Sequence, residues 1–408
     1  MVFLPPVKIQ ALAYVVAALD ALTSGEYGVS VKDRCYNQAR ELLDLCERQD
    51  NGSMLANINT LQTCVLLALY EFKSPNFPRL WMMLGRAIRL CKMMGVDMLD
   101  VAPEPSQPPQ PPFLLPPTSG PAELEERRRT FWILCIFDVS AAVRSPSAVP
   151  AFDAGQLPVH LPGTGNIAEV YRDSKMPLLQ HLDSLPAGFA LPPLAGTVVI
   201  GYLYRRILEH VHLPQQDDQK TSPPYAFWVT HYYLDRLLLG CRVRASQEQP
   251  SAQGRVLHLT MQCNLAAIGV LLHGAALAKA ESESHLPAVL RTEATLQCVA
   301  AAARVHEVIV QAKQLGGTEK DSHRLSGEFF IWPIASAIAI LRMRQARALA
   351  EDQEAPSACP DSIQALTEAL RDLVTPDLIP DGVLDEPDSV AGDGVIEGLE
   401  GGGANVAK

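Results

Sequence analysis

The sequence predicts an all-α fold, a large bundle of many helices with long loops, followed by a disordered acidic C-terminal tail. Three observations predict it. Apolar residues recur at three- and four-residue steps through most of the chain. The alternation that is typical of a half-buried strand is nearly absent. Hydrophobic residues make up 48% of the 408 residues, which is enough to fill a large core.

Four helices are expected before the first long loop. They are expected at residues 11–22, 31–46, 57–72 and 80–94. The apolar stripe of the fourth helix is Trp81, Leu84, Ile88 and Cys91. Gly95 follows as a left-handed stop, and Asn57 or Asn59 is the expected cap of the third helix. Gly85 lies inside the fourth helix, where we expect it to allow close helix packing.

Residues 102–117 form a proline-rich loop, APEPSQPPQPPFLLPP. So many prolines exclude a regular helix and favour an extended polyproline II conformation. A surface loop is the favoured interpretation, and a recognition segment for an SH3-like partner is the alternative.

The next segment, ELEERRRTFW from Glu123 to Trp132, begins as a charged helix. Thr118 or Ser119 is the expected cap, and acids in the first turn suit the positive end of the helix dipole. Glu125 and Arg129 have the favoured acid-to-base spacing of four. We therefore expect Arg127, Arg128 and Arg129 to form a structural ion-pair cluster.

The second half of this helix is apolar on nearly every side. Phe131 and Trp132 are expected in the core, and Asp138 is expected to emerge at the end. The helix therefore begins at the surface and enters the core.

Long helices are expected again in the second half of the chain. They are expected at residues 194–211, 225–246, 255–279, 286–315, 329–350 and 361–374. We divide the chain into an N-terminal helical half at 1–162, a C-terminal helical half of the same domain at 163–375, and the acidic tail at 376–408. The tail is Gly-rich and poor in aromatic residues, which predicts disorder.

Charge and cysteine usage exclude several classes of protein. The formal net charge is -11, whereas direct nucleic-acid binding needs clustered Lys and Arg. The nine cysteines are scattered without a C-x-x-C pair, which favours a reducing compartment over a disulfide scaffold. No segment has the roughly 18–20 clean apolar residues of a membrane span, so no membrane partner is predicted.

The sequence offers little catalytic chemistry. His210 and His212 are expected as an exposed pair, because residues two apart do not share a helix face. The run from Gly163 to Gly165 lacks the strand and the Lys-Ser/Thr of a phosphate loop. We predict no catalytic, cofactor-binding or metal-binding residue, and no enzymatic activity.

Four segments in order resemble the middle homology region of fungal zinc-cluster transcription factors, the fungal-specific transcription factor domain. They are residues 61–72, 80–97, 123–149 and 152–162. The motif positions that carry the resemblance are Gly85, Arg89, Glu125, Arg127, Arg128, Arg129, Phe131, Trp132, Asp138 and Pro146. The family's Gly-Arg-Pro turn reads Arg144-Ser145-Pro146 here, and its six-cysteine zinc cluster is not in the sequence.

The resemblance implies a nuclear transcription-regulatory protein that senses an effector without its own DNA-binding module and controls a metabolic gene cluster. It implies that DNA is contacted only indirectly or through a missing N-terminal module, which would also hold the zinc. Implied partners are a coactivator or another transcription factor, a small-molecule effector and a second copy of the chain.

The alternative functions are a scaffold or corepressor of another transcription factor and, less favoured, an all-helical metabolic enzyme. The segment from Val383 to Glu400 alternates acids with aliphatic residues. It is interpreted either as an activation segment that docks on a coactivator or as a solvated tail.

Overall fold

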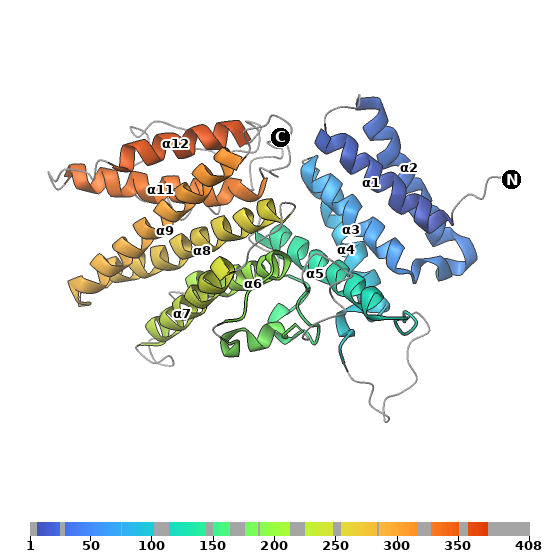
Figure 1. Ribbon diagram of the computed structural model, residues 1–408, viewed down its shortest axis with the longest axis horizontal. Coiled ribbons are helices and arrows are strands. Elements are labelled where there is room, and N and C mark those ends of the chain that lie inside the picture. Colours follow the sequence, from blue (N-terminus) through green and yellow to red (C-terminus); the bar gives the residue numbers. More distant parts are fainter. Residues whose placement is uncertain are drawn as a thin grey trace. The chain divides into compact units, whose positions relative to one another are not determined.

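The structure is a computed structural model that describes most of the chain (Figure 1). The described residues are 6–24, 29–74, 76–101, 114–143, 150–163, 176–186, 188–212, 225–247, 254–283, 285–315, 328–350 and 358–373. They contain helices and no β-strand, and an isolated bridge pairs His160 with Leu178. The predicted all-α class is confirmed. Most of the proline-rich loop, Pro146 and the acidic tail lie outside the described residues.

The described residues divide into two compact units, the first ending at Leu185 and the second beginning at Pro186. The boundary predicted between the two helical halves lay earlier in the chain, after residue 162.

The described part of the first unit contains five α-helices and four short 3-10 helices. The α-helices are α1 (Val7–Ser24), α2 (Val29–Arg48), α3 (Ile58–Lys73), α4 (Phe77–Met93) and α5 (Pro121–Val143). The 3-10 helices are η1 (Gln49–Leu55), η2 (Val96–Met98), η3 (Ala154–Gln156) and η4 (Leu179–Ser184). Helix α3 is central, because α1, α2, α4 and α5 all pack against it.

Two local signals of the first unit have the expected geometry. The Asn57 side chain accepts a hydrogen bond from the Asn59 amide at 2.9 Å and caps α3. Gly95 has a φ of 69°, the left-handed conformation that glycine adopts without strain. The predicted cap at Asn57 and the stop at Gly95 are confirmed.

The predicted core face of α4 was wrong in part. The buried face is Leu80, Met83, Leu84, Ala87, Leu90 and Cys91. Trp81 is 38% exposed and Ile88 is only half-buried. Because Trp81 is large and apolar, the predicted buried face of α4 was centred too close to it. The small side chain of Ala87 instead lies on the buried face, against the neighbouring helices.

The second unit is built around a long central helix. Its helices are α6 (Pro193–His212), α7 (Ala226–Gln247), α8 (Arg255–Ser282), α9 (Ala288–Leu315), α11 (Glu328–Ala350) and α12 (Ala358–Leu373). Helix α8 packs against α6, α7, α9 and α11, and Figure 1 shows α8 and α9 running alongside each other. Apolar residues of α8, α9, α11 and α12 form one continuous core, which contains Phe330, Ile334 and Leu366.

Two described helices, α1 and α8, are long and apolar enough to cross a membrane by length and composition alone. The structure buries 72% of the most apolar window of α8 and 22% of that of α1. The match is weak evidence for a membrane span, because the core helix of a soluble protein and a signal sequence pass the same test.

Candidate functional site

The first turn of α5 is fixed by its own acid. Glu123 accepts hydrogen bonds from the Ser119 amide at 2.8 Å and the Ser119 hydroxyl at 2.7 Å. It also pairs with Arg127 at 2.5 Å. These donors lower the pKa of Glu123 to about 2. Arg127 in turn donates to the Pro116 carbonyl at 2.8 Å, which attaches the end of the proline-rich loop to the helix.

Arg128 forms a two-point ion pair with Asp100, which lies just after η2. The Nε atom of Arg128 donates to Oδ2 of Asp100 at 2.9 Å, and its Nη2 atom contacts Oδ1. The same Oδ2 atom accepts a hydrogen bond from the His160 amide at 2.9 Å. Burial alone would raise the pKa of Asp100, but the hydrogen bonds from Arg128 and the His160 amide, with the Arg128 charge, lower it below its ordinary value.

Glu125 forms an equivalent bridge one turn earlier on α5. It is buried, it pairs with Arg129 at 2.9 Å, and it accepts a hydrogen bond from the Gly163 amide at 2.8 Å. Two carboxylates held by arginines of α5, those of Asp100 and Glu125, therefore bind the backbone of residues 160–163.

The aromatic half of α5 holds the same segment. Trp132 is fully buried, and its Nε1 atom donates to the His160 carbonyl at 2.7 Å. The ring of Phe131 packs edge-on against that of Phe152 at 5.4 Å. The expectation that Asp138 emerges at the end of the helix was wrong, because Asp138 is buried and accepts a hydrogen bond from the Ala151 amide at 2.7 Å.

We call these side chains of Glu125, Arg128, Arg129, Trp132 and Asp138, together with Asp100, the α5 clamp. Its contacts are directed at other parts of the first unit, so we infer that the motif residues of α5 are structural. Sequence analysis missed Asp100, because one carboxylate in a loop has no distinguishing pattern. It also missed the backbone groups of His160 and Gly163, which carry no sequence signal.

Two motif residues lie away from the clamp. Gly85 and Arg89 are exposed on α4. A Cβ atom built on Gly85 has no neighbouring heavy atom within 4 Å. The expectation that Gly85 allows close helix packing was therefore wrong. A close approach occurs instead at Gly196 of α6, where a Cβ atom would lie 1.9 Å from the sulfur of Met261 on α8.

The two glycines should respond to alanine in opposite directions. Gly85→Ala should stabilise the protein by about 0.5–1 kcal/mol, because alanine is favoured in an open helix position. Gly196→Ala should destabilise it by about 1–3 kcal/mol, because Met261 must move. Urea unfolding of the purified variants measures both changes. A loss of stability in Gly85→Ala would show that another surface covers this part of α4.

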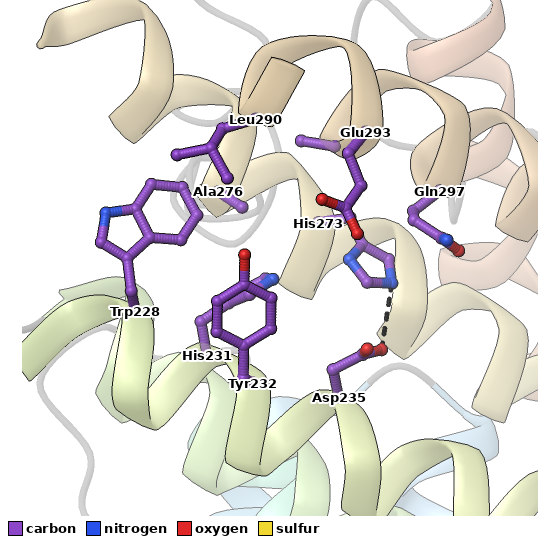
Figure 2. A pocket seen from close by; sticks show the side chains of 10 residues that line it. Trp228, His231, Tyr232, Asp235, His273, Ala276, Leu290, Glu293 and Gln297 are labelled. Atoms are coloured by element: carbon purple, nitrogen blue, oxygen red, sulfur yellow. Dashed lines mark ion pairs between the residues drawn. The ribbon is translucent and has the colours of Figure 1, made fainter. Parts of the chain in front are cut away.

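The second unit contains a small pocket between α7, α8 and α9 (Figure 2). Its volume is about 30 Å³, enough for one or two water-sized groups. The lining residues are Trp228, His231, Tyr232, Asp235, His273, Ala276, Leu290, Glu293, Ala294 and Gln297. Sequence analysis did not find this pocket, because its residues come from three helices and form no local motif.

Three buried histidines lie in and beside the pocket. His231 is 6.0 Å from His210 and 5.6 Å from His273, measured between ring centroids. Burial, followed by the charges of His273 and His210, lowers the pKa of His231 to about 4. Burial, followed by the charges of Arg242 and Arg304, lowers that of His273 to about 4. Both rings are therefore neutral at pH 7.

The prediction that His210 is exposed was wrong. His210 is buried and stacks on Phe227 with ring centroids 4.3 Å apart. The aromatic neighbour comes from α7, so the sequence around His210 could not reveal it. Within the described ranges, no group of three or more His, Cys, Asp or Glu residues is arranged to hold a metal ion.

The α5 motif lies in the part of the chain for which a family match is found. Residues 26–168 match the family model described as the fungal specific transcription factor domain. This match confirms the resemblance predicted from the sequence.

Relatives extend the match well beyond the domain. The chain is 28% identical to the depudecin biosynthesis cluster-specific transcription activator DEP6 of Alternaria brassicicola, over 81% of the chain and 50% of that protein. It is 35% identical to the pigment biosynthesis transcriptional activator pigB of Monascus ruber, over 56% of the chain and 40% of that protein. The chain thus spans about half the length of these curated relatives. No solved structure matches it.

Proposed function

We propose that the chain is the regulatory part of a nuclear transcription regulator that controls the genes of a fungal secondary-metabolite cluster. The observation that carries the proposal is the similarity to DEP6, a cluster-specific transcription activator, over 81% of this chain. The relative pigB, a transcriptional activator of pigment biosynthesis, supports the same assignment.

The chain's charge decides how it would reach DNA under this proposal. Its formal net charge of -11 repels the phosphate backbone. We therefore propose that DNA is contacted through another module or a partner factor, and that this chain receives a signal and passes it to a coactivator. The α5 clamp supports such a role as rigid scaffolding, because its charges are used inside the first unit.

The proposal is tested by deleting the gene in its host and measuring transcripts of the biosynthetic genes around it. We expect those transcripts to fall and the metabolite to disappear, and complementation with the intact gene should restore both. Unchanged transcripts throughout the neighbouring cluster would contradict the proposal.

The acidic tail gives a separate prediction. With the chain fused to a foreign DNA-binding domain, deletion from Pro376 onward should lower the output of a reporter gene, because acidic segments with interspersed aliphatic residues bind coactivators. A matched variant keeps the tail's length and changes the acids between Val383 and Glu400 to their amides. It should lose output like the deletion. Unchanged output in both variants would assign the tail no role in activation.

A further inference from the structure

The pocket of the second unit has an aromatic wall on one side. Trp228 and Tyr232 lie one turn apart on α7, with ring centroids 6.2 Å apart. Figure 2 shows both side chains extending from α7 toward the residues of α8 and α9 that complete the pocket. Tyr232 is 48% exposed, so its ring is accessible from solvent. The faces of Trp and Tyr rings attract organic cations.

Two carboxylates stand at the same pocket, and neither forms an ion pair with a lysine or arginine among the described residues, although the charge of Arg242 acts on Asp235. Glu293 of α9 forms no ion pair there, and Asp235 of α7 pairs only with His273, at 3.4 Å, a ring that is neutral at pH 7. Burial, followed by the charges of Glu293 and Asp235, raises the pKa of Tyr232. The lining therefore carries two negative charges and no positive one at neutral pH.

A buried histidine lies beside these two carboxylates. His231 is 4% exposed and lines the pocket, and its Nδ1 atom has no hydrogen-bond partner in the described structure. A neutral imidazole can accept an N–H bond at one ring nitrogen. Arg242 and Arg304 do not line the pocket, and their charges help to keep His273 neutral. A primary ammonium group has three N–H donors, and the carboxylates of Asp235 and Glu293 can accept hydrogen bonds from them.

We propose that this pocket binds the protonated amino group of a small organic amine. The volume of about 30 Å³ accommodates the ammonium head, while the apolar remainder of the ligand lies against Trp228 and Leu290. Resting on the proposed function, the amine is the effector of the regulator. An anionic ligand would be repelled by Asp235 and Glu293, and a neutral one would gain no attraction from their charges.

Binding is tested with the purified full chain and three probe compounds that differ in charge. The probes are 2-phenylethylamine, the neutral 2-phenylethanol and the anionic 3-phenylpropanoate. Isothermal titration calorimetry and tryptophan fluorescence should show binding of the amine at least about tenfold tighter than the alcohol, and none of the acid. Equal binding of the alcohol, or preferred binding of the acid, would overturn the proposal.

Variants locate the site. The double change Asp235→Asn and Glu293→Gln should weaken amine binding by about tenfold or more, and Trp228→Phe should remove the fluorescence response. Glu307→Gln is the matched control, because Glu307 is an exposed acid of the same helix that does not line the pocket. Circular dichroism and melting curves check that each variant folds. Unchanged amine affinity in a folded double variant would refute the site.

The effector role is tested separately in the reporter fusion. An amine that binds should change reporter output in the intact chain and leave the double variant unaffected. Binding without any reporter response would refute the effector role and leave the proposed control of a gene cluster standing. The proposed control of a gene cluster would be refuted only by unchanged transcripts in the gene-deletion experiment.

Discussion

Replacing Trp132 with alanine should lower the free energy of unfolding by about 3–5 kcal/mol, the usual cost of deleting a fully buried large aromatic ring. Trp132 is 0% exposed, and its ring packs edge-on against Phe131 at 5.1 Å. The change also leaves the His160 carbonyl without the 2.7 Å bond from Nε1. Much of the first unit's stability therefore depends on this side chain.

Equilibrium unfolding in urea, followed by circular dichroism, measures this loss. Trp81→Ala is the matched control, because Trp81 is a partly exposed tryptophan of the same unit, and it should cost clearly less than Trp132→Ala. Equal effects of the two changes would show that the burial assigned to Trp132 is wrong.

Replacing Arg128 with methionine should cost roughly 2–4 kcal/mol, somewhat below the 3–5 kcal/mol of a fully buried pair, because Arg128 is 16% exposed. Asp100 would keep its charge at a position that is 9% exposed, with the His160 amide as its remaining hydrogen-bond donor. Arg86→Met is the control, because Arg86 pairs with the more exposed Asp44 and Glu47 and should contribute about 1 kcal/mol or less.

The Arg128 variant should also change the response to acid. The folded-state pKa of Asp100 is lowered, so its ionised form stabilises the fold above its unfolded pKa of about 3.9. That contribution is lost as the pH falls through the lower folded-state pKa. The wild type should therefore lose more stability than Arg128→Met on acidification below about pH 4. Parallel pH profiles for both proteins would contradict the role given to this pair.

Helical periodicity was sufficient to predict the fold class. Each helix expected from the sequence is present, with ends that differ by a few residues. Spacing also predicted the contacts within α5, because Glu125 and Arg129 are four residues apart on one helix. Helical spacing predicts a contact when both residues lie on the same helix.

Sequence reasoning was less successful where a partner is distant in the chain. The face of α4 was misplaced, because Trp81 is large but exposed. Asp100 is 28 residues from Arg128, and no periodicity links them. The α7–α8–α9 pocket depends on three helices, and the burial of His210 depends on Phe227 of another helix. These features follow from tertiary packing, for which a single sequence shows no local pattern.

The α5 clamp has a consequence for how this region can vary during evolution. At positions 151, 160 and 163 the clamp forms hydrogen bonds with main-chain atoms. These hydrogen bonds do not require a particular side chain at those positions. Proline is the exception, because it lacks the amide hydrogen that Asp138, Asp100 and Glu125 each accept. Homologous proteins can thus differ in the amino-acid sequence of this segment and keep the same backbone conformation.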